Sequence, residues 1–412
     1  MQPLRWTVAA STDLVGFLTM RYAYISLGKL VYVDESGERH ELESRFAADY
    51  RARAQSIQRK ASWKTQGTGA RFMGMGPVWG QDLDLEAIPV SFTGLARGAS
   101  THELVYSLST GVVGGVFVMN LRTKEERRLF HSAEQRIEQL ATSPDHAVIA
   151  CSLRNKDGTS NIGVMASDGS EVSMVTDGDS IDLLPAWLPR SCIKDDNIHQ
   201  LLYQSAGVGR DASGTFVAIA PASIELLDPE HGAVNTLLND STRDFFAPKM
   251  TADRALYCLR RPYEDANAPS AKRFLLDILL FPFRLLGALL GWLNFFTLRY
   301  SGRPLVTSGN ARKRSADLRQ MIMLGNLFGA KEDADREDDK ARERALRNWE
   351  LVAIDERDKS AKAITSGVSA FDLFADGSIL VTNGRAITLI GTDGGRKEIA
   401  KDKMITAILA LD

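Results

Sequence analysis

The sequence is short of the residues from which many metal sites and nucleophilic sites are built. It has three cysteines, an odd number, and no Cys-x-x-Cys pair. Its six histidines are scattered, and no His-Glu-x-x-His or His-x-x-x-His spacing occurs. We therefore expect no metal and no cofactor. We interpret Cys151, Cys192 and Cys258 as buried free thiols of a reducing compartment, with metal binding or nucleophilic chemistry as the alternative.

The signature motifs of common enzyme classes are also absent. There is no Gly-x-x-x-x-Gly-Lys-Ser/Thr loop, no dinucleotide fingerprint and no Gly-x-Ser-x-Gly elbow. The segment 176–182 groups three carboxylates, but it lacks the glutamate of an EF-hand, so we interpret it as a turn and not as a calcium site. We predict no catalytic residue, and hence a non-enzymatic protein.

A strong excess of one charge is missing as well. The formal net charge is −2, so the overall charge does not favour nucleic acid as a partner. A basic cluster lies in a helix expected over 45–61, which we interpret as a solvated helix face, with a membrane patch or a nucleic-acid contact as alternatives. At the N-terminus Asp13 and Arg21 interrupt the apolar stretch, which makes a poor signal peptide and leads us to expect a cytoplasmic protein.

Most of the chain consists of short apolar or alternating runs, separated by turns rich in glycine and aspartate. This pattern predicts an all-β fold. The expected strands are Leu104–Leu108, Gly115–Asn120, Ala147–Leu153, Ile162–Met165, Leu201–Gln204, Thr215–Ile219, Ala255–Leu259, Leu351–Ile354, Ser378–Thr382 and Ala386–Ile390.

The turns before several strands recur along the chain. Ser143-Pro144-Asp145, Thr251-Ala252-Asp253 and Phe374-Ala375-Asp376-Gly377 each precede a strand, and 195–197 fills the slot between the first two. The spacing is about fifty residues once one long insertion is removed. A period of about 40–55 residues with four strands per unit is typical of a β-propeller.

The segment 143–189 resembles the repeat of TolB-like, WD-type β-propellers. The matching motifs are Ser143-Pro144-Asp145, Lys156-Asp157-Gly158, Met165-Ala166-Ser167-Asp168-Gly169, Thr176-Asp177-Gly178 and Pro185-Ala186-Trp187. The resemblance implies a single propeller of about six four-stranded blades over 1–262 and 349–412. Because propellers often pair strands from the two chain ends, we expect these ends to share one blade.

The long insertion, 263–348, falls inside one blade. The run 257–261 is expected as the second strand of that blade and 349–355 as its third, with about eighty-five residues where other repeats have a short turn. Within it, 274–298 is the most apolar stretch of the chain. On a helix its polar residues, among them Asp277, Arg284 and Asn294, fall on one narrow stripe, so the helix is amphipathic.

The propeller interpretation excludes a single membrane crossing by this helix, because both its ends belong to one blade. We predict that it lies on the inner face of a membrane, with apolar residues in the acyl boundary and basic residues at anionic headgroups. The alternatives are a shallow re-entrant hairpin bent at Pro282, a helix buried against a partner protein, and a helix folded against the propeller wall. The predicted membrane- or partner-binding residues are Leu275, Leu279, Phe283, Leu286, Leu290, Trp292, Leu293, Arg299, Arg303, Arg312, Lys313 and Arg314.

These expectations lead to one functional hypothesis and two alternatives. The hypothesis is a cytoplasmic β-propeller scaffold that is peripheral on a membrane and assembles other proteins through its faces. The first alternative is a subunit of a larger membrane protein complex, with the insertion packed on a transmembrane partner. The second is an enzyme of hydrolase or lactonase type that uses the central channel.

Overall fold

A computed structural model describes residues 20–53, 56, 90–110, 113–133, 135–170, 172–193, 199–214, 216–263, 346–355 and 360–411. The chain divides into two compact units. The first comprises Met1–Gly209, Ile219–Tyr263 and Glu332–Asp412, and the second Arg210–Ala218 and Glu264–Lys331. The sheets described below belong to the first unit, except where β13 and β14 run into the second.

Four sheets have four strands each, connected as antiparallel meanders. The first contains β25 (Ile405–Leu411), β1 (Arg21–Ser26), β2 (Lys29–Val33) and β3 (Arg39–Leu42). The second contains β4 (Ser91–Arg97), β5 (Glu103–Ser109), β6 (Gly114–Asn120) and β7 (Glu126–Ser132). The third contains β17 (Arg243–Met250), β18 (Ala255–Pro262), β19 (Glu350–Asp355) and β20 (Ala361–Ser366). The fourth contains β21 (Ala370–Leu373), β22 (Ile379–Thr382), β23 (Ala386–Ile390) and β24 (Arg396–Lys401).

A nine-stranded sheet joins two further meanders. One is formed by β8 (Arg136–Thr142), β9 (Val148–Arg154), β10 (Ser160–Ala166) and β11 (Ser173–Met174), and the other by β12 (Ser180–Trp187), β13 (Leu201–Arg210), β15 (Ser223–Asp228) and β16 (Ala233–Leu238). β14 (Phe216–Ile219) lies between β13 and β15 in the chain, and a 3-10 helix (Arg190–Cys192) follows β12. The only strand pairing between the two meanders among the described residues is the parallel one of Ser160 with Ile181.

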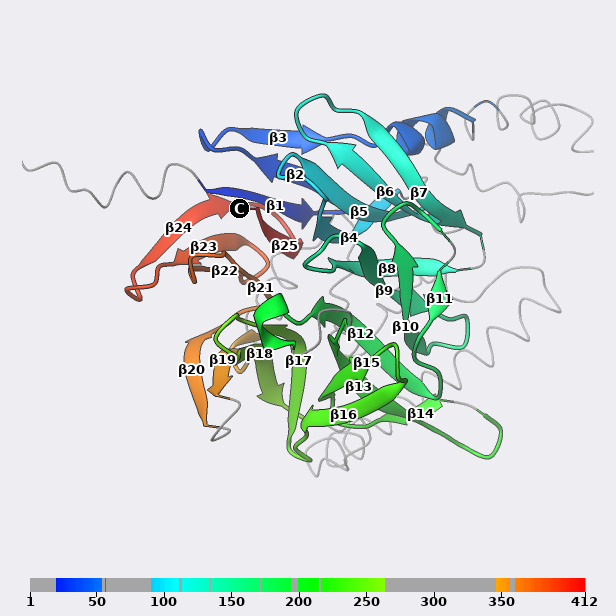
Figure 1. Cartoon of the computed structure of the whole chain (residues 1–412), viewed down its shortest axis with the longest axis vertical. Helices are drawn as coiled ribbons and strands as arrows, with labels where there is room; N and C mark the ends of the chain where they lie inside the picture. Colours follow the sequence, from blue (N-terminus) through cyan, green and yellow to red (C-terminus); the bar gives the residue numbers. More distant parts are fainter. Residues whose placement is uncertain are drawn as a thin grey trace, which may run out of the picture. The chain divides into compact units, whose positions relative to one another are not determined.

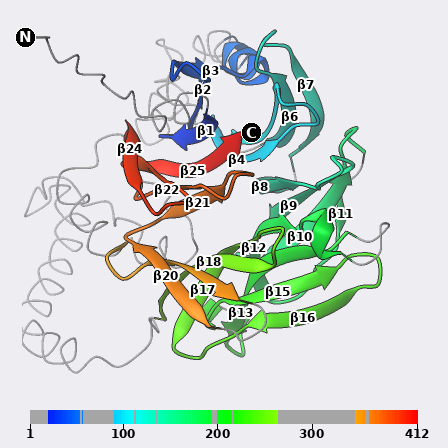
Figure 2. The same ribbon diagram turned by 60° about the vertical axis from the view of Figure 1, so that its left-hand side comes forward.

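The first strands of successive sheets lie side by side. Contacts run from β25 to β4, from β4 to β8, from β8 to β12 and from β12 to β17, and they return from β21 to β25. Lys249 of β17 reaches β21 by an ion pair with Asp372, with 2.5 Å between Nζ and Oδ1. Figures 1 and 2 show these sheets following one another in chain order around a common centre. This is the architecture of a β-propeller.

Burial is greatest in the middle strands of a sheet and least in its outer strand. β5 and β6 are buried on both faces, whereas β16, β20 and β24 are largely exposed. The cores lie between neighbouring sheets: Ala23 and Ile25 of the first sheet pack with Leu104 and Tyr106 of the second. Continuous runs of Val, Leu and Ile therefore mark middle strands, because both faces are covered. Every strand expected from such a run is present, and the prediction of an all-β fold is confirmed.

Bulges interrupt the inner strands at similar places. Gln139 of β8, Leu184 of β12 and Ala247 of β17 have φ of 47°, 54° and 52°, and the pairing register shifts at each. Pro185 and Pro248 follow the last two, at positions where the ladder is already broken and no N–H is needed. Gln139 also joins two bulges, because its Oε1 accepts a hydrogen bond from the Leu184 N–H at 3.0 Å.

A helix begins at Arg45, as expected, and is described over 45–53. Its first turn is capped by a carboxylate from another sheet: Glu126 of β7 accepts hydrogen bonds from the N–H groups of Arg45 and Phe46, at 2.9 and 3.0 Å. The buried Tyr106 hydroxyl donates to the same carboxylate at 2.5 Å. Burial, together with this hydrogen bond, raises the pKa of Tyr106. Glu126 therefore holds the helix against the second sheet.

Replacing Glu126 by alanine removes the cap and leaves the Tyr106 hydroxyl buried without its acceptor. We expect Glu126→Ala to lower the free energy of unfolding by about 1–3 kcal/mol. The neighbouring exposed Glu125 is the matched control, because its carboxylate accepts only a 3.3 Å bond from the Thr123 hydroxyl of the same turn. Urea unfolding followed by circular dichroism measures both; equal losses for the two variants would show that the cap contributes nothing.

Candidate functional site: the base of the long insertion

The residues predicted to meet a membrane or partner lie outside the described residues. Of the predicted insertion, only 263 and 346–348 are described, so the helix expected over 274–298 is not tested. Among the residues that the structure does describe, no helix has both the length and the apolar character needed to cross a membrane. What the structure does define is the base of the insertion, where the chain leaves one sheet and returns to it.

The chain leaves and re-enters the sheet at adjacent positions. β18 ends at Pro262 and β19 begins at Glu350, and the two strands are antiparallel neighbours with Arg260 opposite Glu350. An ion pair joins these two side chains, with 2.6 Å between Arg260 Nη2 and Glu350 Oε2. The prediction that these runs are the second and third strands of one sheet is confirmed.

A second set of contacts clamps the base from the side of β17. The Arg261 Nε–H donates to Asp244 at 2.8 Å, and Asp244 is buried. The Arg261 guanidinium lies over the rings of Phe246 and Trp349, at 5.2 and 4.9 Å from their centroids. These two rings meet edge to face at 4.9 Å. Aromatic and cation–π contacts of this kind make the buried Trp349 a fixed end point for the returning chain.

Tyr263, the last residue described before the insertion, is held by two hydrogen bonds. Its N–H donates to the Thr242 carbonyl at 2.9 Å, and its hydroxyl to the Ile219 carbonyl at 2.5 Å. On the returning side, the Trp349 N–H donates to the carbonyl of Leu346, which is buried. Hydrogen bonds therefore hold the chain in place on both sides of the insertion.

Loss of Arg261 leaves Asp244 buried without its ion partner. We expect Arg261→Gln to destabilise the propeller by about 3 kcal/mol, because removing one partner of a buried pair leaves an uncompensated charge. The control is Arg243→Gln, on the same sheet but exposed, for which we expect a change below about 0.5 kcal/mol. Both are read from urea unfolding. A small loss for Arg261→Gln would mean that the clamp is not a structural element.

Two carboxyl groups are buried within one meander, on strands that flank β13. Asp182 of β12 and Glu225 of β15 are 2% and 8% exposed, too little for a substrate to reach them. Their partners are hydroxyl groups: Ser205 donates to Asp182 at 2.7 Å, and Ser223 and Thr236 to Glu225 at 2.5 and 2.7 Å.

Burial has a direct effect on the ionisation of this pair. It raises the pKa of Asp182, and the Glu225 charge adds to that shift, against the hydrogen bonds from nearby hydroxyls. A raised pKa in the folded state means that folding favours the protonated acid. The geometry supports a structural role for the pair and not acid–base catalysis.

The sign of this shift sets a pH-dependent prediction. The stabilising contribution of protonated Asp182 is fully present below about pH 4 and is lost as the pH rises through the folded-state pKa. Asp182→Asn keeps the group neutral at every pH. We therefore expect it to raise the unfolding temperature relative to the wild type, by an amount that grows between about pH 4 and pH 8.

The control for this pH series is Asp177→Asn in the exposed turn before β12, for which we expect no such growth with pH. Thermal unfolding across the pH series is the measurement. A difference between Asp182→Asn and the wild type that does not change with pH would contradict the assignment.

The cysteines agree with the prediction of buried free thiols. Cys151, Cys192 and Cys258 are all free and buried. Burial raises the pKa of Cys151 and of Cys258 to about 12, so at neutral pH neither is the thiolate that nucleophilic or metal chemistry needs.

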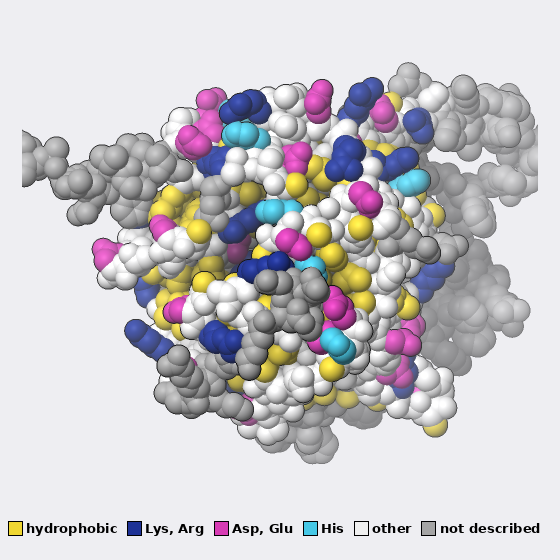
Figure 3. Space-filling view, in the orientation of Figure 1, with side chains coloured by type: hydrophobic (Ala, Val, Ile, Leu, Met, Phe, Trp, Pro, Cys, Tyr) yellow, Lys and Arg dark blue, Asp and Glu magenta, His cyan; other side chains and the backbone are white. Residues whose placement is uncertain are grey.

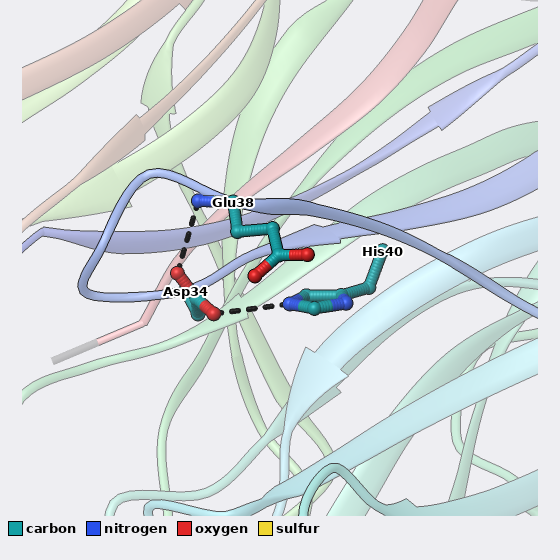
Figure 4. A group of neighbouring side chains, drawn as sticks. All are labelled: Asp34, Glu38 and His40. Carbon is teal, nitrogen blue, oxygen red and sulfur yellow. Dashed lines mark hydrogen bonds and ion pairs between the residues drawn. The ribbon is translucent and has the colours of Figure 1, made fainter.

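A group that our sequence reasoning missed lies on the β2–β3 hairpin. Asp34, Glu38 and His40 bring potential ligand atoms within 4.8 Å of one another, and it is the only such group among the described residues. Figure 4 shows the three side chains pointing toward one another. Glu38 lies in the turn just before β3, His40 lies in β3 opposite Tyr32, and the turn folds Asp34 back beside them.

The surface of the described residues shows no large patch of one kind of side chain in the view of Figure 3. On the face shown in Figure 3, basic and acidic groups are interspersed. Four large hydrophobic residues of the described chain are exposed, and they are single residues on different elements: Leu27, Met174, Val217 and Val234. Isolated exposures of this kind are ordinary for a soluble surface and mark no docking patch.

Comparisons with known proteins bear on the fold alone. No protein-family model matches the chain, and no curated protein matches it by sequence. Among solved structures, the chain is similar to TolB from Acinetobacter baumannii, with 10% identity and a TM-score of 0.46 over 96% of this chain and 67% of that one. It is also similar to a chain of the nidogen/laminin complex, with 9% identity and a TM-score of 0.47 over 95% and 98% of the two chains.

A third similar structure is the tricorn protease, at 10% identity and a TM-score of 0.44. The match covers 94% of this chain but only 33% of that protein. The assignment of this chain as a β-propeller rests on its own strand order and on the contacts between its inner strands.

Proposed function

We propose that the chain is a six-bladed propeller of the TolB-like repeat type that has no catalytic site of its own. It docks peripherally on the cytoplasmic face of a membrane through residues 263–348 and assembles other proteins on its propeller faces. The four separate four-stranded sheets, together with the two meanders of the nine-stranded sheet, support a count of six blades.

The observation that carries the membrane proposal is the geometry at the base of the insertion. Arg260 and Glu350 are opposite one another in register and joined by an ion pair, so the insertion begins and ends at one place on a folded sheet. A segment with both ends on one side of a membrane must cross it an even number of times or not at all. The insertion has one apolar run long enough to cross, so we place that run along the surface.

The composition of the insertion supports surface binding by two contributions together. Burial of apolar side chains such as Leu286 and Leu290 contributes on the order of 1 kcal/mol or more each. The basic residues that follow, among them Arg312, Lys313 and Arg314, add about 1 kcal/mol each near an anionic surface, and salt weakens this second contribution. Either contribution alone gives marginal binding, whereas the two together give firm binding.

Flotation with anionic liposomes tests the proposal. We expect the wild-type chain to float, and Leu286→Glu combined with Leu290→Glu to abolish flotation at any salt concentration, because the apolar contribution is lost. Replacing Arg312, Lys313 and Arg314 together by Gln should weaken binding mainly at low salt, where electrostatic attraction is largest. Met174→Glu with Val234→Glu, two exposed apolar residues of the other compact unit, is the matched control and should float like the wild type.

Two outcomes would reject membrane docking. A Leu286→Glu/Leu290→Glu variant that floats like the wild type would mean that another surface binds the lipid. Failure of the wild type to float, with co-purification of an integral membrane protein that depends on the same leucines, would establish the insertion as a protein-binding element of a larger membrane complex.

A further inference from the structure

The β2–β3 hairpin carries three potential metal-ligand side chains, and contacts with their surroundings hold two of them, Asp34 and His40, in place. The Oδ1 atom of Asp34 accepts hydrogen bonds from the Ser36 N–H, the Ser36 hydroxyl and the Glu38 N–H, at 2.9, 2.6 and 3.0 Å. These three bonds hold one oxygen of the carboxylate in place. They also hold the carboxylate so that its other oxygen, Oδ2, is turned toward His40.

His40 is fixed as well. Its ring stacks on the ring of the buried Tyr32, with 6.0 Å between centroids and 23° between planes. Tyr32 and His40 are direct cross-strand partners in the register of β2 and β3. The hairpin itself is not free to move, because β2 is paired with β1, and β1 with β25. The ligand atoms of Asp34 and His40 are therefore in place before an ion binds, which lowers the entropic cost of binding.

The distances fit a shared ion. The Asp34 Oδ2 and His40 Nε2 atoms are 3.0 Å apart, and all three side chains offer a ligand atom within 4.8 Å of the others. Two ligands of one tetrahedral Zn²⁺, each at about 2.0–2.1 Å, are about 3.3 Å apart. A small movement of the imidazole would thus replace the Asp34–His40 hydrogen bond by one metal bond from each of these two side chains. Figure 4 shows the Glu38 carboxylate directed at the same space.

The protein contains an internal comparison for this group. Two other histidines form the same carboxylate pair: His199 with Asp145 at 2.8 Å and His231 with Asp228 at 2.9 Å. Among the described residues, neither of these pairs has a third ligand within reach. An Asp–His pair is thus an ordinary ion pair of this chain, and the third ligand, Glu38, is what makes the β2–β3 hairpin different.

We propose that Asp34, Glu38 and His40 bind one divalent transition-metal ion, of which Zn²⁺ is the representative. One imidazole and two carboxylates form a ligand set suited to Zn²⁺ and related first-row ions, and less suited to Ca²⁺ or Mg²⁺, which prefer six or more oxygens. Three protein ligands leave at least one position for water or for a carboxylate or imidazole of a partner. The inference does not depend on the membrane proposal, because the hairpin lies far from the insertion in sequence.

Titration calorimetry of the full chain with Zn²⁺, after treatment with EDTA, tests the site. We expect one site of highest affinity, weakened at least tenfold in Glu38→Gln and in His40→Ala. His231→Ala is the control, because it removes an Asp–His pair that has no third ligand within reach among the described residues, and it should leave that affinity unchanged. Glu38→Gln preserves the size of an exposed side chain, so its effect on binding does not depend on a change in folding.

Four results would overturn the proposal. The first is the absence of Zn²⁺ binding to the wild type. The second is an equal loss of affinity in His40→Ala and His231→Ala, which would mean scattered binding by surface histidines. The third is binding of Ca²⁺ or Mg²⁺ as tight as that of Zn²⁺, which would exclude His40 as a ligand. Zn²⁺ binding that Glu38→Gln leaves intact would reduce the site to an Asp–His pair and would also reject it.

Discussion

The structure depends on the pairing of its first and last described strands. β1 and β25 are antiparallel partners from Arg21 opposite Leu411 to Ser26 opposite Ile405, and all six residues of β1 are buried. Without this pairing the first sheet would lose its inner strand, and two sheet edges would be open to other chains. The pairing brings together residues almost four hundred positions apart, so it carries a large loop-closure cost, which the burial on both sides of β1 offsets.

Once this ring is closed, the inner strands must approach closely, and specific polar groups join them. Arg97 of β4 donates to the Ala410 and Leu373 carbonyls, both at 3.0 Å, and thus connects three sheets. Asp372 of β21 accepts from the Ala410 N–H at 2.8 Å while it pairs with Lys249. Backbone groups at a crowded centre would otherwise be buried without partners, and these side chains supply the partners.

How far the sequence predicts this arrangement depends on the position of each strand within its sheet. Middle strands such as 351–354 are continuous apolar runs, so composition alone finds them. Inner strands are harder, because the bulges at Gln139 and at Ala247-Pro248 break the alternation, and proline normally argues against a strand. β12 was foreseen only as the Pro185-Ala186-Trp187 motif of the resembled repeat. The repeat of turns, and not the strands themselves, identifies the propeller.

The sequence predicts the two candidate sites to different degrees. The insertion was visible because it interrupts a repeat, so its entry and return strands could be named from order along the chain alone. The group of Asp34, Glu38 and His40 was not, because it depends on the register of a hairpin turn and on which side of the strand each residue faces. The motif spacings that identify zinc sites on helices do not describe ligands on a hairpin turn and on the strand that follows it.

The same reasoning explains how one sheet tolerates so long an insertion. The entropic cost of closing a loop grows only as the logarithm of its length, so extending a short hairpin turn to about ninety residues costs about 3 kcal/mol. Three contacts stabilise β18 and β19 where the insertion begins and ends. They are the ion pairs of Arg260 with Glu350 and of Arg261 with Asp244, and the packing of the Arg261 guanidinium on Trp349. The stabilisation expected from these contacts is comparable to the loop-closure cost and can offset it. The fold therefore keeps the β18–β19 register unchanged while leaving the length and chemistry of the inserted segment free to serve binding.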